Sequence, residues 1–362
     1  MSRKNRVVVI TGASSGIGRA TALRFARTGA SLVLASRREH ALTELVQECE
    51  RLGAQGAIAV PTDTANPESV QALADAAVER FGRIDVWVNN AAVGLYAPFL
   101  DVPLDDFRRV IDVNLMGYVY GARAALEVMN RQGKGVLINV SSIVGEVPQP
   151  YSSAYGMSKA AVRSLGASLR SEQLVKKTKG IKVSTIMPAA IDTPFFRHAA
   201  NYTGRKVLAM PPVFSAEKVA RTIVNVSQVP RSEVAVGATS KAMVRQHRKT
   251  PQSVEAQMAV QVEKSHLGRG QRVDDTPGTL YTPDTNPADA EVTGGWHGKQ
   301  RLRRRRILGG AAIVASAFAL WKSRTVRALV IGKYLQPVLM VAGLAAEKRP
   351  RRNRFQRLLR LS

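Results

Sequence analysis

The fold is decided by the stretch Val7-Val8-Val9-Ile10-Thr11-Gly12-Ala13-Ser14-Ser15-Gly16-Ile17-Gly18 near the start of this 362-residue chain. An apolar β-branched run leads directly into a turn with three glycines, and a helical pattern follows. Such a turn brings the backbone close to a phosphate, and the first N–H groups of the helix donate to it. Glycines also serve ordinary turns, but their position after the first strand favours dinucleotide binding. The expected contacts are Gly12, Ser14, Ser15, Gly16, Ile17 and Gly18.

Residues 6–240 alternate between short apolar runs and helix-length segments. We expect strands at Val7–Thr11, Ser31–Ser36, Ala57–Pro61, Ile84–Asn89, Gly135–Val140, Lys182–Met187 and Val234–Val236. We expect helices at Gly18–Thr28, Ala41–Leu52, Pro67–Phe81, Leu104–Gln132 and Ala154–Lys176. This alternation predicts an α/β fold, a doubly wound parallel sheet of about seven strands with helices on both faces. Residues 1–240 would form this domain.

The composition changes after residue 240. Residues 241–267 have a polar helical pattern and predict a helical extension. Residues 268–298 contain nine Gly or Pro residues, which predicts a linker in which Tyr281 and Trp296 are candidates for docking onto the domain. The single cysteine, Cys49, excludes an intramolecular disulfide and a Cys-rich zinc site, and no metal site is expected. The first apolar run is too short for a secretory signal, which favours the cytoplasmic side.

The formal net charge of +26 is concentrated at the C-terminus, where residues 299–362 hold 17 Lys or Arg and one Glu. Two apolar stretches lie there, Ile307–Trp321 and Ala328–Ala346. The first is shorter than the roughly 20 residues of a spanning helix, and the second contains Lys333 and Pro337. The pattern favours a re-entrant or interfacial pair of helices on an anionic cytoplasmic membrane surface. The alternatives are a soluble helical hairpin docked on protein, or nucleic-acid binding, which the apolar stretches disfavour.

Two arginines, Arg37 and Arg38, follow the second expected strand. A site selective for the unphosphorylated ribose usually has an acidic residue at this position. Guanidinium groups instead suit a 2′-phosphate, so the pair favours NADP(H) over NAD(H). The alternative is that both arginines are simply solvated.

Tyr155 and Lys159 lie four residues apart in an expected helix and therefore share a face. A free tyrosine titrates near pH ~10. A lysine ammonium ~4 Å away would favour phenolate by about 4 kcal/mol at an effective dielectric constant of ~20. That energy corresponds to roughly three pK units, so such a tyrosine can pass a proton to a carbonyl oxygen. Taken alone, a Tyr-x-x-x-Lys pair is common by chance and usually marks an exposed helix face.

Together these motifs resemble the short-chain dehydrogenase/reductase family, over roughly residues 5–240. The ordered set comprises the glycine turn, Asp63, Asn89-Asn90-Ala91-Ala92, Asn114, Ser141-Ser142, Tyr155-x-x-x-Lys159, and Pro188 with Thr193. The resemblance implies a Rossmann-like fold and the catalytic residues Ser142, Tyr155, Lys159 and Asn114. In that scheme Ser142 holds the substrate carbonyl, Tyr155 is the general acid, Lys159 lowers the tyrosine pKa, and Asn114 positions Lys159 through a water. It implies further cofactor contacts from Asp63, Thr64, Asn90, Ala91, Tyr155, Lys159, Pro188 and Thr193.

One departure from the family pattern is Pro188-Ala189, where the family commonly has Pro-Gly. An alanine in a left-handed conformation would be strained, so we expect a changed loop geometry there. The family resemblance also implies a homodimer or homotetramer.

The segment Ile191–Val213 is the expected substrate lid. Its apolar side chains favour an apolar or lipid-like ketone, aldehyde or alcohol, with Arg197 and Arg205 as the candidates for holding an anionic group. The sequence therefore predicts an NADP(H)-dependent oxidoreductase. A soluble 3-oxoacyl thioester reductase and an inactive cofactor-binding membrane scaffold are the alternatives.

Overall fold

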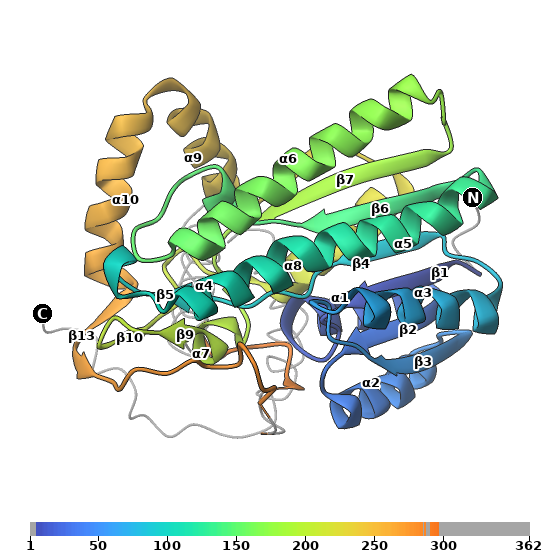
Figure 1. Cartoon of the computed structure of the whole chain (residues 1–362), viewed down its shortest axis with the longest axis horizontal. Helices are drawn as coiled ribbons and strands as arrows, with labels where there is room; N and C mark the ends of the chain where they lie inside the picture. Colours follow the sequence, from blue (N-terminus) through green and yellow to red (C-terminus); the bar gives the residue numbers. More distant parts are fainter. Residues whose placement is uncertain (1–4, 285, 287–289, 297–362) are drawn as a thin grey trace, which may run out of the picture. The chain divides into compact units, whose positions relative to one another are not determined.

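A seven-stranded parallel sheet forms the centre of the protein (Figure 1). The computed structural model describes residues 5–284, 286 and 290–296. The strand order is β12-β7-β6-β4-β1-β2-β3. The predicted doubly wound α/β class is confirmed. The strands are β1 (Val7–Thr11), β2 (Ser31–Ser36), β3 (Gly56–Pro61), β4 (Val86–Asn89), β6 (Gly135–Val140), β7 (Ile181–Pro188) and β12 (Glu233–Val236).

The order of the strands reverses beside β1. The chain runs outward from β1 to β2 and β3, and then returns to place β4 on the other side of β1. In doubly wound sheets the crevice at such a reversal, at the carboxyl ends of the strands, is where ligands bind. The glycine turn after β1 opens at this crevice.

Helices cover both faces of the sheet because successive apolar side chains of each strand point to opposite faces. Val8 and Ile10 of β1 pack in one cluster with side chains from α1, α2 and α8. Val7 and Val9 pack in the other with side chains from α3 and α5. The helices are α1 (Gly16–Ala26), α2 (Glu39–Arg51), α3 (Pro67–Phe81), α4 (Leu104–Ile111), α5 (Gly117–Gln132), α6 (Ser153–Val175) and α8 (Ala216–Gln228).

The structure divides the single helix expected at Leu104–Gln132. A π-helical turn, Asp112–Met116, separates α4 from α5. Within it, the Asn114 side chain accepts from the Val93 N–H at 2.8 Å and donates to the Val93 carbonyl at 2.9 Å. A wider turn of this kind is common at functional sites, and here it presents a buried amide toward α6.

Small elements extend the domain beyond the carboxyl ends of the sheet. Three short two-stranded pairs and α7 (Phe195–His198) come from the expected lid and its surroundings. Residues 241–267 lie mostly in α9 (Ala238–Lys249) and α10 (Pro251–Ser265), which pack as a hairpin. The pairs are β5 (Leu95–Tyr96) with β9 (Ala200–Asn201), β8 (Ile191–Asp192) with β11 (Phe214–Ser215), and β10 (Arg205–Val207) with β13 (Leu267–Arg272).

The helical hairpin is less polar on its inner side than the sequence pattern indicates. Val254, Met258 and Val262 of α10 are buried with Tyr96 and Val147 of the main domain. The extension is therefore part of the packed structure and supplies a wall of the site.

The segment 268–298 differs from the expected linker. Its first residues belong to β13, Leu280 is fully buried, and the Trp296 indole N–H donates to the Thr193 carbonyl at 2.9 Å. The physical reason is that main-chain carbonyls of this segment are hydrogen-bonded by arginines of the domain, which its composition cannot reveal. The described part of this segment therefore packs on the domain.

The two apolar helices expected within residues 299–362 lie outside the described residues. Among the helices that the structure describes, none is both long and apolar enough to cross a membrane.

Candidate active site

The glycine turn has the geometry that only glycine allows. Gly12 and Gly16 have φ values of +64° and +52°, in the left-handed region. A Cβ atom on Gly18 would lie 2.1 Å from the Gly12 carbonyl oxygen. The turn therefore folds back directly onto α1 and leaves the first N–H groups of that helix at the crevice.

Thr11 and Asn90 brace this turn from the neighbouring strand ends. The Thr11 hydroxyl accepts from the Asn90 N–H at 2.9 Å and the Ala91 N–H at 3.1 Å. The Asn90 amide donates to the Thr11 carbonyl at 2.9 Å and the Gly12 carbonyl at 3.2 Å. Asn90 thus lies beside the crevice, and its hydrogen bonds hold the glycine turn in place.

A cavity of about 310 Å³ opens at the carboxyl ends of the strands. Among the predicted site residues, only Gly18 and Asn114 are not part of its lining. The others, which come from the turn after β1 through the residue after β8, are brought together there: Gly12, Ser14, Ser15, Gly16, Ile17, Arg37, Arg38, Asp63, Thr64, Asn90, Ala91, Ser142, Tyr155, Lys159, Pro188 and Thr193.

The end of the cavity beside β2 holds Arg37 and Arg38. Arg38 donates from Nε and Nη2 to the Ser14 hydroxyl at 3.2 and 3.0 Å, which places its guanidinium between β2 and the glycine turn. Arg109 donates to Asp63 at 2.8 Å. Burial acts to raise the pKa of Asp63, but hydrogen bonds from Arg109 and the Ala65 N–H outweigh it and lower that pKa. Asp63 is therefore a charged acceptor beside the arginines.

Arg37 has partners that the sequence did not suggest. It neither lies solvated nor pairs with an acidic side chain of the domain: its guanidinium donates to the main-chain carbonyls of Thr279, Leu280 and Tyr281. Arg37 therefore faces the later segment of the chain while still lining the cavity.

At the other end, Tyr155 and Ser142 lie together. Burial raises the pKa of Tyr155 to about 12, against the lowering effect of a hydrogen bond with Ser142. Tyr155 therefore holds its proton at neutral pH in this structure, which differs from the lowered pKa that we expected.

Lys159 explains the difference. It is 1% exposed, and its ammonium donates to the Tyr118 hydroxyl and to the Val140 carbonyl, both at 3.1 Å. Its Nζ lies 5.7 Å from the centre of the Tyr155 ring. Burial lowers the pKa of Lys159 to about 7, which also weakens its effect on the phenol.

Asn114 contacts the start of α6. Its amide donates to the Ser158 hydroxyl at 3.3 Å, and that hydroxyl donates to the Tyr155 carbonyl at 2.7 Å. Ser141 donates to the Lys159 carbonyl at 2.7 Å. These bonds fix the first turns of α6 against the ends of β6 and the π-helical turn.

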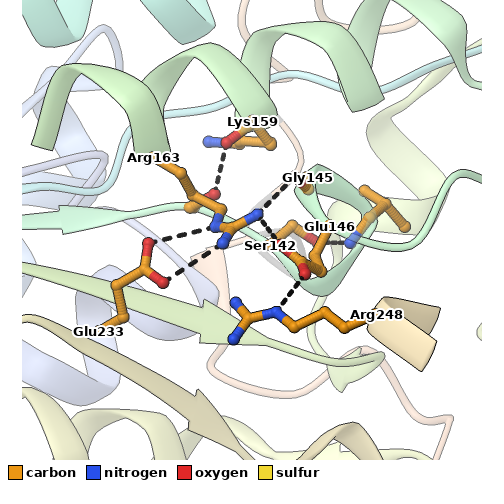
Figure 2. A network of polar contacts seen from close by, with 9 residues as sticks. Ser142, Gly145, Glu146, Lys159, Arg163, Glu233 and Arg248 are labelled. Carbon is orange, nitrogen blue, oxygen red and sulfur yellow. Dashed lines mark hydrogen bonds and ion pairs between the residues drawn. The ribbon is translucent and has the colours of Figure 1, made fainter. Parts of the chain in front are cut away.

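A charged network holds the loop that follows Ser142 (Figure 2). Arg163, one helical turn after Lys159, donates to the Gly145 carbonyl at 3.0 Å and to Glu146, and it pairs with Glu233 of β12 at 3.2 Å. Arg248 of α9 donates to the other Glu146 oxygen at 2.7 Å. Burial acts to raise the pKa of Glu146, but the two arginines lower it overall. The Ser142 loop is thereby tied to α6, β12 and α9.

The half of the cavity beyond Tyr155 is mostly apolar, with walls from the expected lid, the Ser142 loop and the α9–α10 hairpin. Tyr96 and Phe196 make edge contacts with the His266 ring, with ring centres 5.0 and 5.8 Å apart. Burial lowers the pKa of His266 to about 4, so the ring is neutral at physiological pH. The apolar lining includes Tyr96, Val144, Phe195, Phe196, Met210, Pro211, Pro212, Met243 and Met258.

Some lid expectations are corrected. Arg205 pairs with Glu263 at 2.7 Å and does not line the cavity, so it is not placed to hold an anionic group there. Tyr202 donates to Asp106, outside the cavity. Ala189 is not among the described residues with positive φ, so the strain considered for that position is absent.

Sequence reasoning missed Tyr118 and Arg109. Tyr118 receives a Lys159 hydrogen bond, and Arg109 holds Asp63. Both lie in the segment that was interpreted as one long helix. Tyr118 follows Asn114 by four residues, so its helical spacing from that amide was the available signal.

The chain is similar to known oxidoreductases. The family model described as "short chain dehydrogenase" matches residues 6–202. A protein of Bacillus subtilis (strain 168) described as the uncharacterized oxidoreductase YxnA is 39% identical over 242 residues, covering 66% of this chain and 67% of the relative.

Two further matches have names that state a substrate or a cofactor for those proteins. 3beta-hydroxysteroid dehydrogenase 1 of Eggerthella lenta is 39% identical over 193 residues, 53% of this chain and 72% of that protein. A crystal structure of a short chain dehydrogenase/reductase from Burkholderia phymatum in complex with NAD matches with a TM-score of 0.64 and 30% identity. The match covers 70% of this chain and 96% of that one.

Removing the buried ammonium should stabilise the fold while it abolishes activity. In Lys159→Met, we expect loss of turnover and a higher Tm at pH 6, because burial of the charged form opposes folding. The pKa of Lys159 is about 7 folded and higher unfolded, so the penalty is complete below pH 7 and disappears as the pH rises toward about 10.4.

The stabilisation should therefore shrink when thermal melts are repeated at pH 10. Lys176→Met, at the exposed end of α6, is the matched control and should leave Tm nearly unchanged at both pH values. A lower Tm for Lys159→Met at pH 6 would show that the buried ammonium of Lys159 does not oppose folding.

Proposed function

The chain belongs to the short chain dehydrogenase family, and from that premise we propose that it interconverts an apolar or lipid-like ketone or aldehyde with its alcohol, using NADP(H). Its membership and its relatives support an NAD(P)-dependent dehydrogenase or reductase. The substrate class, the choice of NADP(H) and the residue roles that follow are parts of the proposal.

One observation supports the proposed reaction above all. The Tyr155 and Ser142 hydroxyls are hydrogen-bonded to each other at the place where the polar and apolar halves of the cavity join. When bound, the nicotinamide would supply or accept the hydride. Ser142 would donate a hydrogen bond to the substrate oxygen. Tyr155, protonated at neutral pH, would donate its proton to that oxygen during reduction.

Lys159 would act on the tyrosine from behind. Its ammonium is oriented by Tyr118 and the Val140 carbonyl, and burial lowers its pKa to about 7. A positive charge at this place favours the phenolate that forms when Tyr155 gives up its proton. Asn114 would position the helix that carries both residues, through Ser158.

The walls of the cavity support an apolar substrate. Phe195, Phe196, Met210, Met243 and Met258 line the half beyond Tyr155, and Arg205 is engaged by Glu263. Such walls suit a rigid hydrocarbon body, as in the steroid named for the Eggerthella lenta relative. The complete Ser142, Tyr155, Lys159 and Asn114 set speaks against an inactive scaffold.

Oxidation of NADPH tests the reaction. Purified protein should oxidise NADPH with hydroxysteroid-type ketones and long-chain ketones, and Tyr155→Phe should reduce kcat by about 10²-fold or more, the usual size of a general acid's contribution. Phe195→Tyr, in the same cavity, is a control that keeps Tyr155. Turnover with acyl-carrier thioesters alone would favour a 3-oxoacyl thioester reductase, and turnover with polar sugars alone would contradict the apolar substrate.

For the cofactor, Arg38 supports NADP(H). Its guanidinium lies against Ser14 of the glycine turn, where a 2′-phosphate beside β2 would meet it. Arg38→Gln should raise the KM for NADPH by about 10- to 100-fold, the worth of one or two charge-assisted hydrogen bonds, and change the KM for NADH little. Arg27→Gln, at the exposed end of α1, is the matched control. Equal losses with both cofactors would contradict a 2′-phosphate role.

Residues 299–362 support attachment to an anionic membrane surface on the cytoplasmic side, through their 17 basic residues and two apolar stretches. The full chain should sediment with vesicles containing about 30% phosphatidylserine at low salt and less at high salt, since surface charges are screened. Neutral vesicles are the control. Equal recovery with both vesicle types would remove the electrostatic part of this proposal. A homodimer or homotetramer remains a proposal from the family.

A further inference from the structure

Two described pieces of the chain beyond residue 240, residues 276–284 and 290–296, lie along the proposed cofactor half of the cavity. We call them the strap. Thr279, Pro283 and Asp284 line the same cavity as Gly12, Ser14 and the arginines after β2. The strap is therefore a part of the site that the dinucleotide motif does not include.

The first piece is held by arginines. Arg37 donates from Nη1 to the carbonyls of Leu280 and Tyr281 at 3.1 and 2.8 Å, and from Nη2 to the Thr279 carbonyl at 2.6 Å. Arg109 donates to the Leu280 carbonyl at 3.0 Å. Three guanidinium donors of Arg37 are thus used by main-chain oxygens of the strap.

The second piece is anchored at the glycine turn and at the end of the lid strand. The Gly16 N–H, the first of α1, donates to the Glu291 carbonyl at 3.0 Å. Asp192 accepts from the N–H groups of Gly294 and Trp296 at 3.0 and 2.8 Å. The Trp296 indole adds its bond to Thr193. The Glu291 carbonyl oxygen therefore uses the Gly16 N–H, a donor at the N-terminus of α1.

We propose that the strap competes with the cofactor for these donors and so restrains its affinity. This inference rests on the proposed cofactor site. The Gly16 N–H suits the pyrophosphate, which NAD(H) and NADP(H) share, because helix N-termini attract anions. Arg37 suits the 2′-phosphate, which only NADP(H) carries. One end of the strap thus restrains both dinucleotides, and the other end restrains NADP(H) selectively.

Two glycines allow each end of the strap to be displaced by a change within the strap. A Cβ on Gly294 would lie 2.1 Å from the Thr193 carbonyl oxygen. A Cβ on Gly278, whose φ is +53°, would lie 2.3 Å from the His198 carbonyl oxygen. Neither glycine lines the cavity, although Thr193 and His198 do, and an alanine at either position pushes the strap away from their main-chain oxygens while every side chain that lines the cavity is kept.

The test is titration of the full-length variants with NADPH and NADH, followed by the fluorescence of the reduced nicotinamide. Gly294→Ala should lower the Kd of both cofactors by a similar factor, about three- to tenfold, the worth of a hydrogen bond. Gly278→Ala should lower the Kd of NADPH more than that of NADH. Gly133→Ala, a left-handed glycine with open space at the end of α5, is the matched control and should change neither.

Unchanged or higher Kd values in Gly294→Ala would overturn the competition and make the strap a supporting wall of the site. Equal tightening of both cofactors in Gly278→Ala would overturn the role of Arg37. If Gly294→Ala fails to fold by circular dichroism, Trp296→Phe keeps an aromatic ring beside Phe196 but removes the indole N–H, and it should shift both Kd values in the same direction; unchanged values would count against the proposal. Because binding needs no substrate, absent turnover would reject the proposed reaction while the Kd shifts decide the strap.

Discussion

The close approach of the glycine turn to α1 is the constraint on which the site depends. A Cβ at Gly18 would overlap the Gly12 carbonyl oxygen, and the left-handed Gly12 and Gly16 let the chain reverse within five residues. The turn is then fixed by the hydrogen bonds between Thr11, at the end of β1, and Asn90, directly after β4. A larger residue in this turn would push α1 away from the sheet, and with it the N–H groups that make the crevice attractive to phosphate. The order of the strands places the end of β6 and the start of α6, with the proposed catalytic residues, beside this crevice.

Much of the fold could be predicted because it depends on short-range patterns. The run Val7–Thr11 alternates faces of a sheet covered on both sides, and Asn66 before Pro67 is a side-chain cap that starts α3 where expected. Tyr155 and Lys159 lie on one helix, so their spacing alone brings them to the same cavity. The π-helical turn at Asn114 was missed because it depends on a distant main-chain partner, Val93.

The strap could not be predicted for a related reason. Tyr281 and Trp296 dock on the domain through their side chains, as their place in the sequence suggested. The other contacts use main-chain carbonyls and N–H groups, which nearly every residue carries, so the Gly- and Pro-rich composition around Thr279 and Gly294 gives no sign of them. The protonation of Tyr155 was also beyond reach. Helix spacing gives the distance between two Cβ atoms, but the ammonium of Lys159 is drawn to Tyr118 and Val140, and burial then raises the pKa of Tyr155 and lowers that of Lys159.

Adjacent arginines illustrate how identical residues acquire different tasks. Arg38 contacts the glycine turn through Ser14, whereas Arg37 contacts the strap. A guanidinium offers several donors in a fixed plane, and a row of three carbonyls can engage them as an anion would. The guanidinium of Arg37 is partly buried, and this desolvation is the largest cause of its lowered pKa. An anion that replaced the strap carbonyls on Arg37 would therefore bind a guanidinium that has already lost part of its hydration. The free energy of this replacement would depend on how much more strongly the guanidinium binds an anion than a carbonyl dipole.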